Sequence, residues 1–180
     1  GLIPAGRLGG GPSIQGQGKY KIDAGHSTTI YNGETVKISS GYVVGGNGSA
    51  ADIVGVLNGI FFNAATTLKP TFSNFYKATI TPANSEDTTA FVIDDPYQQY
   101  VVSSDAARTQ AQHLATYDMN SSAGSDITGK SSSTLDTSET SADGKQFRLL
   151  RTAEDPENED ITAAFFSGIV VSNLNSFNQV

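Results

Sequence analysis

Residues 52–103 constrain the fold of this chain more than any other segment. They contain short runs rich in valine, isoleucine, phenylalanine and tyrosine, separated by serine, threonine, asparagine, proline and glycine. Such runs with turn residues between them are typical of β-strands. Residues 53–57 and 60–62 are almost continuously apolar, as expected of a strand buried on both faces. The segment therefore predicts the core hairpins of an all-β domain, with one tight turn at Asp94-Asp95-Pro96.

Further strands are predicted on both sides of this block. Asn32-Gly33 lies between two β-prone runs and is the strongest short hairpin signal in the chain. Residues 147–151 and 165–174 predict the closing strands. Residues 120–144 are rich in serine, threonine, aspartate and glycine, which predicts an extended surface loop with short strands.

One helix is predicted, over residues 105–118. Asp105 is placed to cap its N-terminus, and an apolar stripe follows at helical spacing. The stripe consists mostly of alanine, so the face that it can bury is thin: Ala107, Ala111, Leu114 and Ala115.

Residues 1–18 are dominated by glycine and predict no regular element, because glycine loses the most backbone entropy on ordering. Their scattered apolar residues leave two interpretations, a disordered terminus or an arm that becomes ordered on another subunit. The predicted organisation is this extended arm followed by one β-domain, residues 19–180, built as an antiparallel sandwich or barrel of jelly-roll type. The arm residues expected to contact a partner are Leu2, Ile3, Pro4, Arg7, Leu8 and Ile14.

Composition excludes several classes of function. The 180 residues carry a formal net charge of -7, which argues against non-specific binding to nucleic acid. The chain has no cysteine, so disulfides, thiolate metal sites and a cysteine nucleophile are excluded. No apolar run approaches the ~20 residues that a membrane helix needs. Neither nucleic acid nor a membrane is therefore expected as a partner.

Motifs for catalysis or cofactor binding are weak. His26 and His113 are the only histidines, and neither has the spacing of a metal-ligand motif. Asp94-Asp95 fits a turn better than a shared proton or metal site, and the acidic residues 154–160 lack the spacing of a calcium loop. The glycine-rich residues 45–48 are not followed by the Gly-Lys-Ser/Thr of a phosphate loop. We therefore expect no enzyme activity, no catalytic or metal-binding residues and no cofactor.

Packing and turn motifs follow one another in order along most of the chain: IPAG at 3–6, YNGETVK at 31–37, VGVLNG at 54–59, FSNFY at 72–76, AFVIDDP at 90–96 with YVV at 100–102, TGKS at 128–131, FRLL at 147–150 and VVSN at 170–173. This order resembles the capsid decoration (cement) proteins of tailed bacteriophages. The chain departs from their pattern at Phe75-Tyr76, where an aromatic-proline pair with tryptophan is often found. It also departs in the serine-rich residues 120–144.

The resemblance implies a structural virion protein that binds the outer surface of an icosahedral phage capsid and stabilises it. The implied partners are the major capsid protein and neighbouring copies of the same chain, as a dimer or trimer, after assembly in the host cytoplasm. The alternative is a phage surface or tail module that binds host glycan. Aromatic side chains in an exposed groove would favour glycan binding, whereas an apolar underside with an ordered arm would favour the capsid.

Overall fold

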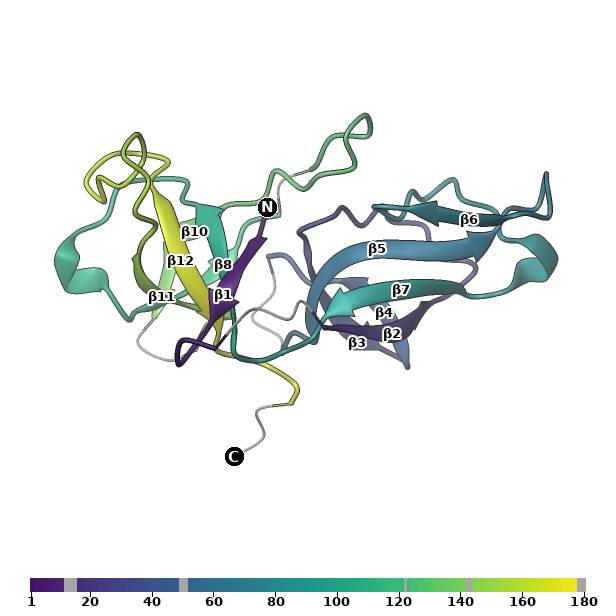
Figure 1. Ribbon diagram of the computed structural model, residues 1–180, viewed down its shortest axis with the longest axis horizontal. Coiled ribbons are helices and arrows are strands. Elements are labelled where there is room, and N and C mark those ends of the chain that lie inside the picture. The colour runs from purple at the N-terminus through teal and green to yellow at the C-terminus, as the bar shows by residue number, and fades with distance from the viewer. Residues whose placement is uncertain (12–15, 49–51, 122, 142–143, 178–180) are drawn as a thin grey trace.

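The computed structural model describes residues 1–11, 16–48, 52–121, 123–141 and 144–177. These residues form an all-β structure of two antiparallel sheets with six strands each, consistent with a β-sandwich. Figure 1 shows the two sheets next to each other along the long axis of the molecule. The prediction of an all-β antiparallel fold is confirmed.

The first sheet, sheet A, contains the strands in the order β1-β8-β12-β11-β9-β10. Beyond β8, Ser104 forms a bridge with Leu135, and the Asp105 N–H donates to the Leu135 carbonyl at 3.1 Å. These contacts bring the last strand of the sheet beside β8, so sheet A curls toward a barrel. The strands are β1 (Ile3–Arg7), β8 (Gln98–Ser103), β9 (Thr116–Met119), β10 (Leu135–Ser141), β11 (Phe147–Thr152) and β12 (Ser167–Ser172).

The second sheet, sheet B, has the order β2-β7-β5-β3-β4, with β6 paired to the far half of β5. The first half of β5 pairs with β3 and its second half with β6, while its pairing with β7 shifts register between Leu57 and Gly59. Strand β4 also lies close to β2, and sheet B therefore curls as well. The strands are β2 (Gln17–Ile22), β3 (Thr35–Ser39), β4 (Tyr42–Gly45), β5 (Gly55–Asn63), β6 (Pro70–Ser73) and β7 (Thr88–Ile93).

Each sheet has its own apolar core, produced by the alternation of side chains along a strand. The core of sheet B includes Ile60 and Val92, and that of sheet A includes Phe147. Val56 and Ile93 belong to strands of sheet B but pack in the core of sheet A. Burying each such side chain contributes about 1.5–3 kcal/mol, so these two residues also couple the sheets.

The N-terminal segment crosses from one sheet to the other. Strand β1 pairs with β8 in sheet A and β2 pairs with β7 in sheet B, both antiparallel. These are the first two strand pairs of a jelly roll, in which the third strand would pair with the sixth and the fourth with the fifth. In the described residues β3 pairs instead with β4 and β5. The jelly-roll connection is therefore not confirmed.

The prediction that residues 1–18 contain no regular element is wrong. Ile3–Arg7 form β1, and β2 already begins at Gln17. The glycine-rich composition did not predict β1 because contacts with distant residues stabilise this strand. Leu2 is buried in the core of sheet A, and β8 supplies the hydrogen-bonding partner. Long-range pairing of this kind overrides local propensity.

The two predicted hairpins are also wrong, although both turns form. Asp94-Asp95-Pro96 joins β7 to β8, which lie in different sheets, so the segment is a crossover. At Asn32-Gly33 the Glu34 N–H donates to the Tyr31 carbonyl at 3.1 Å, as in a turn, but the preceding Ile30 bridges to Tyr76. Turn residues indicate where the chain changes direction, but they do not determine which strands pair with each other.

The predicted helix over residues 105–118 is wrong as well. The segment contains a short 3₁₀ turn, Gln110–Gln112, and then β9, whose four residues are all buried. An alanine stripe buries little area, whereas Tyr117 and Met119 gain full burial in the core of sheet A as strand residues. No helix in the described part of the chain has the length and apolar character that crossing a bilayer requires.

Candidate functional site

The structure places the predicted contact residues of the N-terminus in different surroundings. Leu2 is 3% exposed, and its N–H donates to the Gly33 carbonyl at 2.9 Å. Pro4 is half-buried in β1, and Ile14 lies outside the described residues. Leu2 therefore packs within its own chain.

The exposed residues of this segment form an ordered patch, here called the N-terminal patch (Ile3, Arg7, Leu8 and Tyr97). Ile3 is 63% exposed and Leu8 is 44% exposed. Arg7 Nε donates to Asp95 Oδ2 at 2.8 Å, and the guanidinium lies 5.6 Å from the centroid of the Tyr97 ring. The Leu8 N–H donates to the Tyr97 carbonyl at 2.8 Å. Because these groups are already held in place, a partner would bind them at a lower entropic cost than a free arm.

The backbone edge of β1 is poorly suited to pairing with a further strand. Pro4 has no N–H to donate, and the register shifts between Pro4 and Gly6. The Gly6 carbonyl accepts a hydrogen bond from Gln98 Nε2 at 2.8 Å. Proline and bulges at a sheet edge prevent pairing with another chain. Contacts at the N-terminal patch are therefore expected from side chains.

A small pocket opens beside the start of β1. Its volume is about 200 Å³, and its lining includes Ile3, Asn32 and Lys130. Sites for small molecules usually measure roughly 300–1,000 Å³. The pocket is therefore too small for most such ligands.

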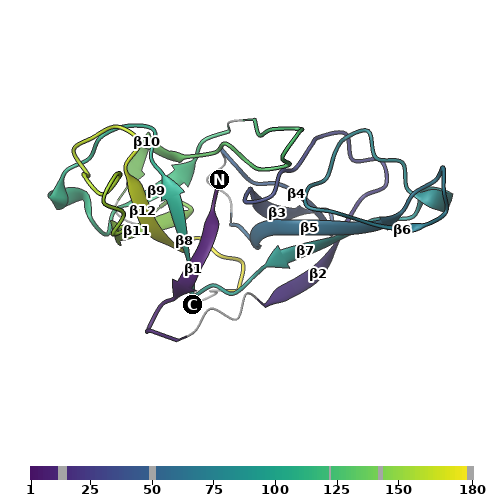
Figure 2. The same ribbon diagram turned by 45° about the horizontal axis from the view of Figure 1, so that its top comes forward.

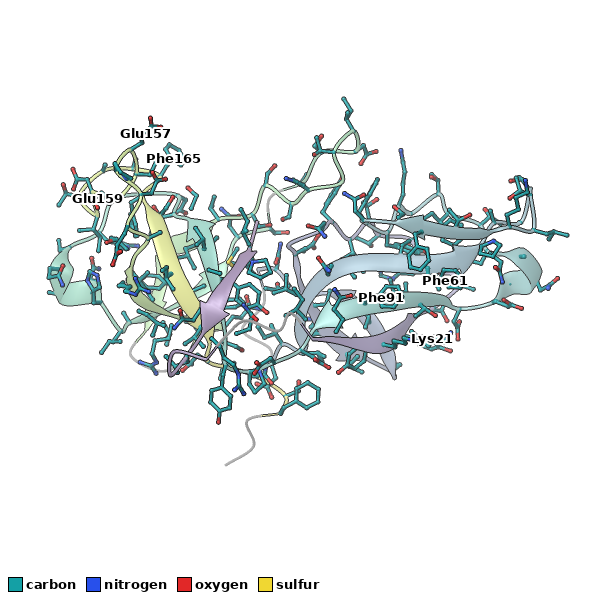
Figure 3. All side chains as sticks on the ribbon, viewed as in Figure 1. Lys21, Phe61, Phe91, Glu157, Glu159 and Phe165 are labelled. Atoms are coloured by element: carbon teal, nitrogen blue, oxygen red, sulfur yellow. The ribbon has the colours of Figure 1, made fainter. Side chains whose placement is uncertain are left out.

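An aromatic cluster of one exposed and two partly buried phenylalanines lies on the outer surface of sheet B. Phe72 on β6 contacts Phe61 on β5 and Phe91 on β7, with ring centroids 5.0 and 5.9 Å apart. Phe72 is 72% exposed. On the next strand, Lys19 pairs with Phe91, and Lys21 Nζ donates to Thr89 Oγ1 at 3.2 Å. We call Lys19, Lys21, Phe61, Phe72 and Phe91 the aromatic face; Figure 3 labels three of these residues.

The aromatic face results from the same alternation that builds the core. Phe91 stands between Ala90 and Val92, which are both fully buried, and Phe61 follows the fully buried Ile60. Successive side chains of a strand point to opposite faces of the sheet. Burying the core residues therefore turns both phenylalanines outward.

A groove of about 590 Å³ runs across this face, lined by Gln17, Lys19, Asn58, Gly59, Phe72, Ser73, Asn74 and Phe91. Gly59 forms part of its lining, and a Cβ at this position would lie 3.1 Å from the Ser73 carbonyl oxygen. Asn74 Nδ2 donates to the Thr128 carbonyl at 2.7 Å, which positions its amide. The volume is within the range of ligand sites, and the lining combines apolar rings with polar groups.

The loop between β11 and β12, residues 153–166, carries the predicted acidic run and is called the acidic loop. Asp155 accepts hydrogen bonds from the Glu157 N–H and from Asn158 Nδ2, both at 3.2 Å. Hydrogen bonds from Thr162 hold the pKa of the Asp160 carboxyl below its usual value. These aspartates shape the loop.

The other acidic side chains of this loop point to solvent. Glu157 and Glu159 are exposed and have no ion pair within the described ranges. Phe165, on the same loop, is 60% exposed. The loop therefore combines free carboxylates with an exposed aromatic ring.

The histidines lie apart from each other in the fold. The His26 ring lies 5.5 Å from that of Tyr76, and burial lowers the pKa of His26. His113 Nδ1 lies 3.0 Å from the Gln110 carbonyl. No group of three or more histidine, aspartate or glutamate side chains suited to hold a metal occurs in the part of the chain that the structure describes.

The paired aspartates serve the crossover between the sheets. Tyr20 Oη donates to Asp94 Oδ2 at 2.7 Å, and burial together with this bond raises the pKa of Tyr20. Asp95 binds Arg7 and accepts the Tyr97 N–H at 2.9 Å. The interpretation of Asp94-Asp95 as turn residues is confirmed.

Sequence reasoning missed Glu34 and the aromatic face. Glu34 Oε2 accepts the Tyr31 N–H at 2.9 Å, and burial raises the pKa of Glu34 to about 7. The sequence signal for Glu34 was an acidic residue directly after the turn residues Asn32-Gly33. The sequence signal for the aromatic face was a large aromatic residue between two smaller apolar ones, as at Phe91.

No protein-family model, no curated protein and no solved structure matches this chain.

Proposed function

We propose that this protein is a structural virion protein that binds the outer surface of an icosahedral phage capsid and stabilises the shell. Its partners are the major capsid protein and neighbouring copies of itself. The function needs no catalytic residue and no cofactor. This proposal rests on the order of motifs along the chain together with the surface of the β-body.

The N-terminal patch carries the proposal. It presents two apolar side chains: Ile3, on a strand that is fixed to the body through β8, and Leu8, which directly follows that strand. A capsid offers many identical sites, so a rigid contact of modest strength gains avidity when neighbouring copies also associate. The N-terminal segment then acts as the partner-contacting arm, in an extended conformation that it already has in the free protein.

The experiment mixes the purified protein with undecorated phage heads and images them by electron microscopy. Ile3→Asp/Leu8→Asp places two charges in the patch without touching the core. We expect regular density at repeated lattice positions for the unaltered protein, and an occupancy at least about tenfold lower for the double variant, the equivalent of about 1.4 kcal/mol. Removing residues 1–18 would be less informative, because it takes Leu2 from the core and β1 from sheet A.

Leu68→Asp/Leu114→Asp is the matched control. Both leucines are exposed, at 70% and 56%, and lie in turns outside the patch. The control is expected to decorate heads normally. Heads decorated equally well by Ile3→Asp/Leu8→Asp would contradict the proposal.

The groove on the aromatic face favours a second candidate, a phage surface or tail module that binds host glycan. Aromatic rings stack on sugar rings, and amides such as those of Asn58 and Asn74 bind hydroxyl groups. A glycan array tests this candidate, with Phe72→Ala as the variant. Selective binding that is lost in this variant would support it, and an array without any signal would count against it.

A further inference from the structure

The aromatic face and the acidic loop are complementary in chemistry. We propose that the aromatic face of one copy binds the acidic loop of a second copy in a head-to-tail contact. This inference deepens the proposed function, because it names the surfaces through which neighbouring copies on a shell would associate. It rests on the proposed function only in that we expect the contact between copies that lie side by side on a capsid.

The apolar part of the contact is an aromatic ring entering a groove. Phe72 and Phe91 line a groove of about 590 Å³ in which Gly59 contributes no side chain. Phe165 of the acidic loop is 60% exposed, and Phe72 is 72% exposed. Aromatic residues of this kind, which bury large areas when they dock in a pocket, dominate the energetics of protein interfaces.

The charged part of the contact pairs opposite signs. Lys19 and Lys21 border the phenylalanines, and neither has a carboxylate partner within the described ranges. Glu157 and Glu159 extend from the acidic loop near Phe165 (Figure 3). Complementary charges across an interface orient the partners and speed their encounter.

The local charges of the two surfaces favour a head-to-tail contact over a symmetric one. A symmetric dimer through the acidic loop would bring the exposed Glu157 and Glu159 against their own copies. A symmetric dimer through the aromatic face would likewise oppose lysine with lysine. Like charges placed opposite each other are unfavourable, and the contact between the two different surfaces avoids both of these oppositions.

The two surfaces lie in different halves of the molecule. Figures 1 and 2 show the β11–β12 loop at the far side of sheet A and the strands of the aromatic face in sheet B. A chain therefore cannot close the contact on itself. Head-to-tail contacts between copies give a ring when the rotation closes and an open array when it does not.

The lysines make a second copy a better occupant than a glycan. An ammonium group can donate a hydrogen bond to a hydroxyl of a neutral sugar, but only an acidic partner such as the carboxylates of the loop adds the stronger, charge-assisted bond. The aromatic face also consists of phenylalanines, which lack the polar atom that tyrosine and tryptophan offer to a polar ligand.

The test is a charge-reversal mixing experiment on the full chain, followed by sedimentation velocity in low salt. Lys19→Glu/Lys21→Glu makes both surfaces acidic, and Glu157→Lys/Glu159→Lys makes both basic. We expect each variant alone to associate at least about tenfold more weakly than the unaltered protein. An equal mixture of the two is expected to associate again, because the acidic and basic surfaces then alternate between copies.

Two further measurements separate this contact from general charge effects. Lys69→Glu/Lys130→Glu changes the net charge equally at exposed lysines outside the aromatic face and is expected to associate normally. Phe165→Ala is expected to weaken association at least about tenfold without any change of charge. Added salt should weaken association of the unaltered protein, since the Debye length falls from about 30 Å at 0.01 M to about 3 Å at 1 M.

Three outcomes would overturn the inference: a protein that stays monomeric up to its solubility limit, variants that associate like the unaltered protein, or a mixture that does not recover association. The inference would also be overturned if the protein stayed monomeric and bound a glycan in a way that requires Phe72, because the aromatic face would then be a sugar-binding site. Binding to heads is measured separately with the N-terminal patch variants. Heads decorated by a protein that does not self-associate would reject this inference and leave the proposed function standing.

Discussion

Sheets A and B have the same number of strands and a core each, but they differ in what they bury and in what they expose. Sheet A buries polar groups beside its core: Asp118 is 5% exposed and binds Lys145, and Gln146 is fully buried. The strands of sheet B bury the neutral residues Thr35 and Thr88, and the outer surface of the sheet carries three phenylalanines. The core positions of both sheets are needed for folding. Phe72 is 72% exposed, and this difference is the reason that we propose the aromatic face as a contact surface.

Removing a large core side chain tests whether the two cores form one cooperative unit. Phe147→Ala in sheet A should lower the free energy of unfolding by about 3–5 kcal/mol, and Ile60→Ala in sheet B by about 2–5 kcal/mol. Because Val56 and Ile93 of sheet B pack in the core of sheet A, we expect a single transition in urea for either variant. Leu68→Ala, at an exposed position, is the control.

Two separate unfolding transitions, one for each sheet, would contradict the coupling of the two cores. They would show that the sheets are independent domains.

Gln146 is one of the polar links between the sheets and gives the next largest effect. Its Nε2 donates to the Gly46 carbonyl at 2.6 Å, and its Oε1 accepts the Met119 N–H at 3.2 Å. Gln146→Leu leaves both backbone groups without these partners and should cost about 1–3 kcal/mol. Chemical denaturation measures this, with the exposed Gln110→Leu as control. An unchanged midpoint would mean that water replaces the amide.

Glu34 should make stability depend on pH. Its pKa in the folded protein is raised to about 7, so the folded state binds more protons than the unfolded state between about pH 4.5 and 7. The stability of the protein therefore falls as the pH rises through this window, by about 1–3 kcal/mol. Glu34→Gln keeps an acceptor for the Tyr31 N–H and should remove this dependence. Thermal melts at pH 5 and pH 8 compare the two proteins, and parallel losses in both would contradict the assignment.

The aromatic face should give the smallest effect on stability. Phe72→Ala removes a ring that is 72% exposed and should change the free energy of unfolding by no more than about 0.5 kcal/mol. The same variant should weaken self-association, whereas Phe147→Ala should mainly lower stability. A large loss of stability would show that Phe72 belongs to the structure of the sheet.

The sequence allowed the strand content to be predicted but not the strand partners. Runs such as residues 91–93 and 100–102 form strands as expected, because β-branched and aromatic residues in short runs are a local signal. The partners depend on contacts between distant residues, so the crossover at Asp94-Asp95-Pro96 was taken for a hairpin. Strand β1 was missed for the same reason.

The sequence indicated residues of the N-terminal patch but did not indicate the aromatic face. Ile3 and Leu8 were expected at a contact surface and lie exposed in an ordered patch. The aromatic face was not anticipated, because Phe61, Phe72 and Phe91 come from three strands and meet only through sheet pairing. Sheet register is what turns three separate residues into one surface.

The pairing of β1 with β8 has a consequence for the synthesis of the chain. The partner of β1 begins at Gln98, so the first strand leaves the ribosome long before the residues that it pairs with. At about 5–20 residues per second, this delay is on the order of several seconds or more. During translation the nascent segment must stay soluble and avoid pairing with strands of other nascent chains. A glycine-rich segment with a proline inside β1 suits that interval.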